Sequence, residues 1–122
     1  MPRCFASRII PNAAVTDAAP AAKSYAYTAD TLFHPEVAER TKNMDMLYHE
    51  TTYLKDLEER AAARFHCTTV QAATIAKAAD VKQLLIGHFS SKYDRLDEFE
   101  REAREVFPNT VLALEGVTYL VR

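Results

Sequence analysis

The sequence predicts an α/β domain with a parallel β-sheet at its centre. Segments with the pattern of short strands alternate with amphipathic helical segments, which is typical of a layered α/β arrangement. The run Leu84, Leu85, Ile86 is apolar without alternation, as expected for a strand that is covered on both faces. The predicted connections are short, and 122 residues suffice for one domain but not for two.

Residues 1–23 differ from the rest, because Pro2, Pro11 and Pro20 stand among many alanines with little periodicity. We expect an irregular lead-in with one short strand over residues 4–10. The regular domain is predicted to span residues 24–122. It begins with a strand over residues 24–30, which ends on Asp30, and Pro35 then suits the first turn of a helix that runs to about Lys42.

The second predicted strand covers residues 44–50 and ends on His49 and Glu50. A helix follows, with one apolar face made by Leu54, Leu57, Ala61 and Phe65. It breaks at "FHCTT", where Thr68 and Gln71 have the spacing of a capping box. The next helix is expected to bury Ala72, Ile75, Ala76 and Ala79.

The third predicted strand is the stretch "VKQLLIG", and His88 follows it. The last predicted helix buries Leu96, Phe99, Ala103 and Val106, and Pro108 and Asn109 end it. Two short strands around Glu115 and Gly116 are expected to close the chain. The regular part therefore reads β-α-β-α-α-β-α-β-β.

Composition excludes several classes of protein. The net charge of −2 provides no global basic field for nucleic acid, so a phosphate-binding surface has to be local. Two glycines are too few for a P-loop or a dinucleotide fingerprint. Apolar runs are too short for a membrane span, and the first residues lack the pattern of a signal peptide, so the cytoplasm is the expected location. The two cysteines, Cys4 and Cys67, make no metal-type pair.

Polar side chains end three of the predicted strands, namely Asp30, His49 and His88, and should share one rim of the sheet. His66, in the loop between two helices, can fold over that rim. Carboxylate and imidazole are the usual ligands of catalytic zinc, which predicts a metal site. The alternative is structural: a strand-end histidine that is held by a backbone carbonyl.

Several ordered blocks of the sequence resemble the C-terminal half of ribonuclease Z, the endonuclease that removes the 3′ trailer from precursor tRNA. The blocks are "YTADT", "MLYHETTYL", "FHCTTVQAATIAKAADVKQLLIGHFSSKY" and "REVFPNTVLALEG". The resemblance implies half of a metallo-β-lactamase-type αββα sandwich over residues 24–122. It also implies two zinc ions in the intact enzyme and precursor tRNA as its substrate.

Matched residue by residue, the resemblance implies roles for individual side chains. Asp30 would bridge the two zinc ions, His88 would bind the second zinc, and His66 would protonate the leaving 3′-oxygen. Glu50 in "HETT" would orient His66, whereas the alternative is that His49 and Glu50 only cap the next helix. The residues implied to border the phosphate or RNA are Thr68, Ser90, Lys92 and Tyr93.

The sequence departs from the family pattern at Ala29, Cys67 and Lys92, where glycine, serine and arginine are usual. None of these three is an implied metal ligand. More important is the His-x-His-x-Asp-His block, which supplies first-metal ligands in the family. The four histidines here are His34, His49, His66 and His88, and they form no such block. We therefore interpret the chain as a C-terminal fragment that binds zinc weakly or not at all and is inactive alone.

Two other interpretations stay open at this point. A half sandwich exposes an apolar sheet face, so the chain is also consistent with a non-catalytic module that dimerises or binds a partner. We expect a homodimer. The missing part could instead make the complete protein another hydrolase with the metallo-β-lactamase fold, because one fold hosts many chemistries.

Overall fold

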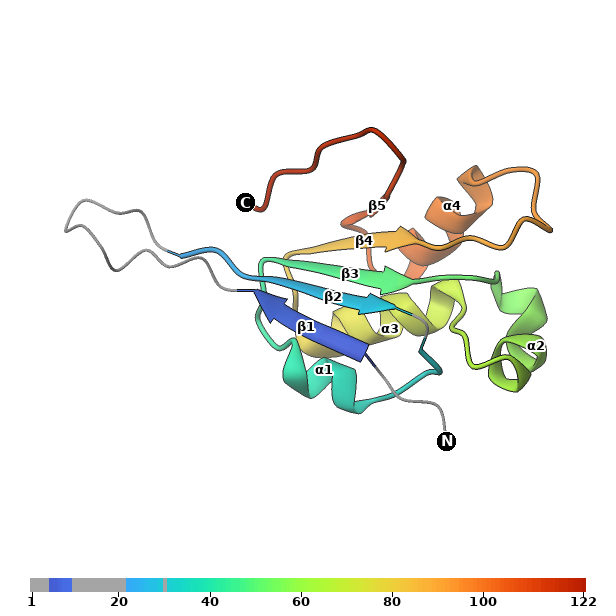
Figure 1. Ribbon diagram of the computed structural model, residues 1–122, viewed down its shortest axis with the longest axis horizontal. Helices are drawn as coiled ribbons and strands as arrows, with labels where there is room; N and C mark the ends of the chain where they lie inside the picture. Colours follow the sequence, from blue (N-terminus) through green and yellow to red (C-terminus); the bar gives the residue numbers. More distant parts are fainter. Residues whose placement is uncertain (1–4, 10–21, 30) are drawn as a thin grey trace.

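A five-stranded sheet forms the centre of the molecule (Figure 1). The structure, a computed structural model, describes residues 5–9, 22–29 and 31–122. The strands lie in chain order, and all neighbours from β2 to β5 are parallel, whereas β1 is antiparallel to β2. Their bounds are β1 (Phe5–Ile9), β2 (Tyr25–Ala29), β3 (Met46–Glu50), β4 (Gln83–Gly87) and β5 (Thr110–Leu112).

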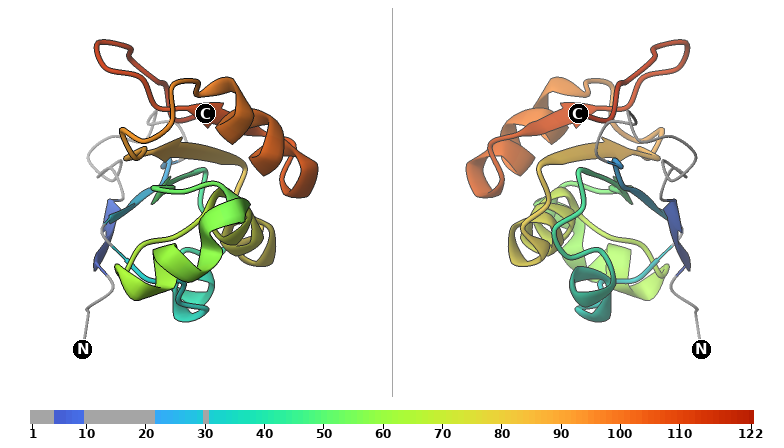
Figure 2. Two further views of the ribbon diagram at one scale, coloured as in Figure 1. Left: turned by 90° about the vertical axis from the view of Figure 1, so that its right-hand side faces the viewer. Right: turned by 90° about the vertical axis from the view of Figure 1, so that its left-hand side faces the viewer.

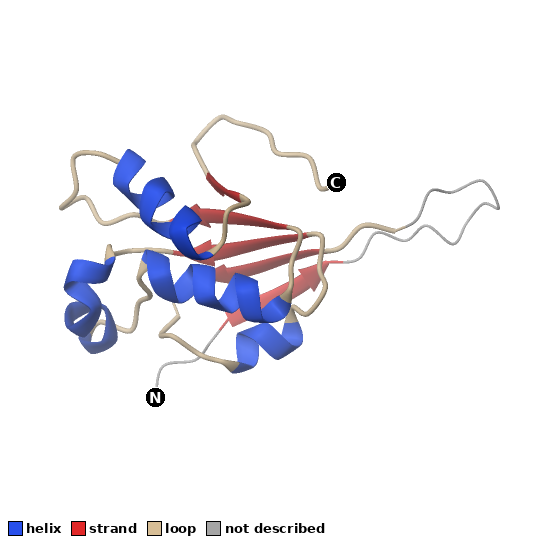
Figure 3. Cartoon of the chain, turned by 180° about the vertical axis from the view of Figure 1, so that it is seen from behind, coloured by secondary structure: helices blue, strands red, loops and turns tan. Residues whose placement is uncertain are grey.

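The predicted parallel core is confirmed, and its strand order explains where the helices lie. Right-handed crossovers between adjacent parallel strands in chain order bring the helices that pack on the sheet to one face of it. Figure 3 shows α1 (Glu36–Arg40), α3 (Thr69–Ala79) and α4 (Asp97–Val106) on that face. The 3₁₀ turn η1 (Lys55–Leu57) and α2 (Glu58–Ala63) lie instead beyond the carboxyl ends of the strands (Figure 1).

The core lies between the sheet and these helices. Alternate strand residues such as Leu47, Leu84 and Ile86 face it and are fully buried. The helices contribute mostly small side chains from α3, which bring α3 close to the sheet, and the large ring of Phe99 from α4. The predicted buried face of α3 is confirmed, and α4 buries Phe99 and Ala103 as expected. In the described part of the chain, no helix has the length and apolar character needed to cross a membrane.

Both ends of α3 have clear physical causes in the structure. Thr68 caps α3 by accepting a hydrogen bond from the Gln71 backbone, while the Gln71 side chain accepts one from the Thr68 backbone, so the predicted capping box is confirmed. The helix ends at Ala79, and Asp80, which caps it, has a left-handed φ of 55°. The predicted helix over residues 54–65 is split into η1 and α2.

The expectation that Phe65 joins the buried face of that helix is wrong. Helix α2 ends at Ala63, and Phe65 has a left-handed φ of 60° that turns the chain away from the helical path. Its ring is consequently 50% exposed. Ala61 is fully buried as predicted, because it lies within the helix proper.

The expected pair of closing strands is also wrong, since only β5 forms. The hydroxyl of Tyr119 donates to the Leu112 carbonyl at 2.5 Å and accepts from the Leu114 amide at 3.0 Å. These two backbone groups are the ones that a neighbouring strand would use. A turn around Gly116, with φ 77°, directs the chain away from the edge of β5.

The sheet face opposite the helices is only partly covered (Figure 2). Tyr27 of β2 is 44% exposed there and stacks on Tyr48 of β3, with ring centroids 4.6 Å apart. Farther along the same face, an apolar hollow of about 260 Å³ is lined by Tyr25, Met46, Leu85, Tyr119 and Val121. The last two belong to the C-terminal segment 113–122. Residues 1–4 and 10–21 lie outside the described part, so the division at residue 23 stays a prediction.

Asp45 joins the starts of three strands at the end of the sheet away from their carboxyl termini. Its Oδ2 accepts the Ser24 amide at 2.8 Å, and its Oδ1 lies 2.9 Å from the Lys82 ammonium. These contacts, with that of Lys82 first, lower the pKa of Asp45 from 3.8 to about 2. The carboxylate therefore stabilises the folded chain most when it is ionised.

Asp45→Asn should lower the free energy of unfolding at neutral pH. It should also make that free energy vary less with pH in acid solution. The depressed pKa means that the stabilisation is fully present above pH 3.8 and is lost as the pH falls toward about 2. Urea unfolding of both proteins across this pH range measures the difference. Exposed Asp94, changed to Asn, is the matched control. A wild-type advantage that persists unchanged in the most acid sample would contradict the assignment.

Candidate functional site

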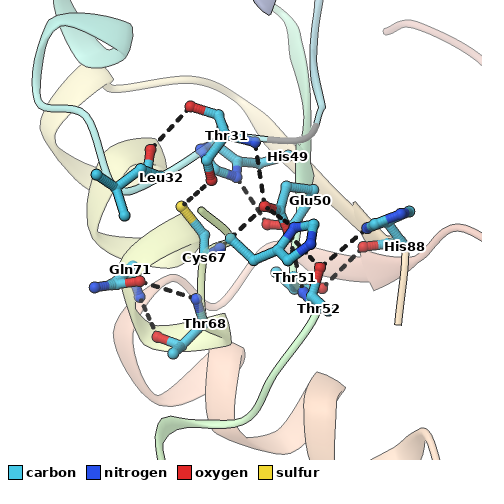
Figure 4. A network of polar contacts seen from close by, with 12 residues as sticks. Thr31, Leu32, His49, Glu50, Thr51, Thr52, Cys67, Thr68, Gln71 and His88 are labelled. Atoms are coloured by element: carbon cyan, nitrogen blue, oxygen red, sulfur yellow. Dashed lines mark hydrogen bonds and ion pairs between the residues drawn. The ribbon is translucent and has the colours of Figure 1, made fainter. Parts of the chain in front are cut away.

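The carboxylate of Glu50 is the centre of a buried polar network at the carboxyl end of β3 (Figure 4). One oxygen, Oε1, accepts the Thr31 amide at 3.3 Å, the Cys67 amide at 3.0 Å and His66 Nδ1 at 3.1 Å. The other, Oε2, accepts the Thr52 amide at 3.0 Å and the Thr52 hydroxyl at 2.7 Å. Glu50 is fully buried, and these five contacts replace the water that its charge would otherwise need.

His66 reaches this carboxylate from the loop between α2 and α3. The loop is held because the His66 amide donates to the Ala61 carbonyl at 2.8 Å and the Cys67 amide donates to Glu50. With Nδ1 bonded to Glu50, the Nε2 nitrogen of His66 is directed away from the carboxylate. The side chain is 22% exposed, so an external group can reach it. The structure thus brings His66 to the rim, as the sequence predicted.

His88 follows β4 in a turn that few residues can form. Its φ is 62°, and Gly87 before it has no room for a side chain, since a Cβ would lie 2.5 Å from the Tyr48 hydroxyl. Histidine is one of the residues that tolerate the left-handed region. The turn places His88 Nδ1 at 3.0 Å from the Thr52 hydroxyl and its ring centroid 5.4 Å from that of His66.

The prediction that His49 shares this rim is wrong. Successive residues of a strand point to opposite faces, so His49 turns toward the helices while Glu50 turns away from them. His49 is fully buried, and its Nδ1 bonds the Glu50 carbonyl at 2.9 Å. Burial lowers the pKa of His49. Asp30, the other predicted rim ligand, lies outside the described residues.

The alternative that His49 and Glu50 merely cap the next helix does not fit this geometry. The residue at the amino end of η1 is Leu54, and no side chain caps it. The Glu50 oxygens instead bind the loops described above. The Glu50 side chain therefore links separate segments of the chain.

Glu50, His66 and His88 offer ligand atoms that lie within 4.8 Å of one another, close enough to surround a metal ion. Five donors already occupy the Glu50 oxygens, which makes this carboxylate a poor ligand. The imidazoles suit zinc better, and each has a hydrogen-bonded Nδ1 of the kind that orients metal-binding histidines. The described residues therefore fit part of a metal site.

The four side chains implied to bind phosphate or RNA are placed differently from one another. Thr68 is buried and its hydroxyl caps α3, while the ring of Tyr93 packs edge-on against Phe99 and its hydroxyl donates to Asp56 at 3.1 Å. Both are part of the framework around the site. Ser90 is half-buried and Lys92 is exposed, in the loop that begins at His88.

Sequence reasoning missed the parts of the network that come from threonines and backbone amides. The Thr31 amide and both donors of Thr52 bind Glu50, and the Cys67 thiol donates to the Thr31 carbonyl at 3.1 Å. The adjacent threonines in "HETT" were the available sign, because threonine after a strand commonly bonds a nearby side chain or backbone group.

A larger cavity, of about 670 Å³, lies at the opposite end of the strands, where Asp45, Lys82 and Asn109 line it. Lys82 is paired with Asp45 at 2.9 Å, so its charge is neutralised there. This cavity shares no residue with the Glu50 network. It is lined by neither His66 nor His88.

Comparison with known proteins gives consistent results. No family model matches the chain. Over 109 residues, 89% of the chain, it is 45% identical to ribonuclease Z of Parabacteroides distasonis and 44% identical to that of Bacteroides thetaiotaomicron. The chain spans 36% and 34% of the length of these relatives, about a third.

Solved structures agree on the fold. A metallo-β-lactamase fold protein from Bacillus subtilis matches 78% of this chain and 39% of its own, with a TM-score of 0.72 and 26% identity. The short form of human tRNase Z matches 82% of this chain and 34% of its own, with a TM-score of 0.64 and 22% identity. The described α/β layer therefore has the fold of one part of a metallo-β-lactamase fold protein, in agreement with the predicted half sandwich.

Glu50→Gln should destabilise the fold by about 2 to 4 kcal/mol, because an amide nitrogen would face buried donors that now meet a carboxylate. Chemical denaturation of the two proteins measures this loss. Exposed Glu59, changed to Gln, is the control and should alter stability little. Equal stability of Glu50→Gln and wild type would rule out the network as a structural centre.

Gly87→Ala should cost about 1 to 3 kcal/mol, since the added Cβ would overlap the Tyr48 hydroxyl, which is 2.5 Å away. In a Tyr48→Ala background the same change should cost much less, because the ring is absent. A double-mutant cycle by thermal or chemical unfolding measures this coupling. Additive effects would show that the glycine is not required by Tyr48.

Proposed function

Because this chain is related in sequence to about a third of ribonuclease Z, we propose that it is one part of a zinc-dependent endoribonuclease that removes the 3′ trailer from precursor tRNA. The observation that carries the proposal is the pair of imidazoles, His66 and His88, 5.4 Å apart and oriented around one buried carboxylate. These residues lie at the carboxyl ends of parallel strands, where ligands of α/β proteins bind. We also propose that the protein acts in the cytoplasm, as expected from the sequence.

His66 would act as the proton donor. In its charged form both ring nitrogens carry protons, and Glu50 Oε1, 3.1 Å from Nδ1, stabilises that charge. Nε2 can then give its proton to the 3′-oxygen as the bond between phosphorus and that oxygen breaks. Return of a proton from the attacking water restores the ring. Glu50 thus positions His66 and does not itself contact the substrate.

The metal part of the site would be shared with residues outside this chain. His88 and Asp30 are the ligands proposed here, and zinc in such a site supplies a hydroxide nucleophile near neutral pH. Two ligands leave zinc incompletely coordinated, and the four histidines of this sequence make no further cluster for it. Ser90 and Lys92, in the loop after His88, would border the phosphate.

The rest of the enzyme would cover the sheet face that the helices leave open. Tyr27 and Tyr48 stack there with part of their surface exposed, next to the apolar hollow. An apolar sheet face of this kind is stable when another layer covers it. We propose that this layer comes from the part of ribonuclease Z that has no counterpart in the chain.

Mixing the chain with the unmatched remainder of the Parabacteroides distasonis enzyme should create tight zinc binding that neither part has alone. Isothermal titration with zinc measures it, and cleavage of precursor tRNA is the second readout. His88→Ala should abolish the gain, whereas His34→Ala, the control histidine, should not. Tight binding by the chain alone, or a gain that survives His88→Ala, would contradict the shared site.

The same open face favours one alternative, a non-catalytic module that forms a homodimer through Tyr27 and Tyr48. Sedimentation of the chain with and without the remainder separates the two functions. The non-catalytic module is supported if the chain forms a dimer without metal, does not bind the remainder, and becomes monomeric in the Tyr27→Glu variant. A monomer that associates with the remainder supports the endoribonuclease.

A further inference from the structure

The hydroxyl of Thr52 lies between the buried carboxylate and the histidine proposed as a metal ligand. Its Oγ1 is 2.7 Å from Glu50 Oε2 and 3.0 Å from His88 Nδ1 (Figure 4). Thr52 is 6% exposed and Glu50 is fully buried, so water does not compete freely for the contact between them, whereas His88 itself is exposed.

The number of hydrogens decides which way each bond runs. A threonine hydroxyl has one hydrogen, and an ionised carboxylate can only accept. The hydrogen of Thr52 therefore points to Glu50 Oε2, and a lone pair of the same oxygen faces His88. The bond to His88 then requires a hydrogen on Nδ1. In the neutral ring, Nε2 consequently carries the lone pair.

The backbone holds this threonine in register with His88 from both sides. The Thr51 amide donates to the Gly87 carbonyl at 2.8 Å, and the Ser90 amide donates to the Thr52 carbonyl at 2.9 Å. The loops after β3 and β4 are thereby joined on either side of the hydroxyl. The contact between Thr52 and His88 thus belongs to a fixed local geometry and does not depend on side chains alone.

We propose that Thr52 is a positioning residue that fixes the Nδ1–H tautomer of His88 and so presents Nε2 as the nitrogen for a metal ion. One carboxylate then orients both imidazoles: Oε1 binds His66 directly, and Oε2 acts on His88 through the hydroxyl. The tautomer of His88 is determined by hydrogen bonds within this chain. Its use for metal binding rests on the proposed function, and an imidazole binds metal through its unprotonated nitrogen.

The tautomer can be measured on the 122-residue chain with ¹⁵N-labelled histidine, by two-bond proton–nitrogen NMR in alkaline solution, where histidine rings are neutral. His88→Gln assigns the signals. We expect the wild type and Thr52→Ser to have the Nδ1–H form of His88, and Thr52→Val to shift toward Nε2–H. Thr51→Val is the matched control, because its hydroxyl bonds the Gly87 carbonyl and not His88. An Nε2–H form in the wild type overturns the proposal even if Thr52→Val fails to fold.

A second measurement separates this inference from the proposed function. In the mixture with the remainder of ribonuclease Z, Thr52→Val should weaken zinc binding by about 10- to 100-fold, and Thr52→Ser should restore it. Unchanged zinc affinity in Thr52→Val, with its tautomer shifted, overturns the metal-positioning role. If the wild-type mixture binds no zinc, the proposed function fails, and the NMR result alone decides the role of Thr52.

Discussion

The geometry of the site depends on one buried negative charge, the carboxylate of Glu50. Four segments that are distant in the sequence end at it: the turn after β2, the loop after β3, the loop before α3 and, through Thr52, the turn after β4. An unpaired buried charge is strongly destabilising, so the donors that these loops provide to Glu50 stabilise the fold. The same requirement that stabilises these loops also brings His66 and His88 together.

The order of the strands supplies the second constraint. With adjacent parallel strands in chain order, all crossovers lie on one face and all carboxyl ends meet at one edge. Because the crossovers lie on one face, the opposite face carries tyrosines and, in the described part of the chain, no helices, which suits a second layer. Because the carboxyl ends meet at one edge, the loops of the network lie side by side. Site and open face are therefore two results of one topology.

Most of the secondary structure could be predicted from the sequence, because apolar periodicity and capping residues act locally. The capping box at Thr68 and the buried strand around Leu85 are examples, and the resemblance to ribonuclease Z added the pairing of His66 with Glu50. Errors arose where a single backbone angle or the strand pleat decides the result. Phe65 leaves its helix through a left-handed φ, and the pleat of β3 turns His49 into the core. The contact of Thr52 with His88 depends on two loops meeting in space, which no local pattern reveals.

The hydroxyl of Tyr119 has a consequence for how this molecule can associate. It bonds the outward carbonyl of Leu112 and the outward amide of Leu114, and so occupies two hydrogen-bonding groups at and just beyond the free edge of β5. An exposed edge is the usual place where a foreign strand attaches and starts aggregation. A side chain of the same molecule makes two of those contacts here, which hinders the pairing of a foreign strand with this edge. The open face of the sheet has no such protection and is the surface that we propose for assembly.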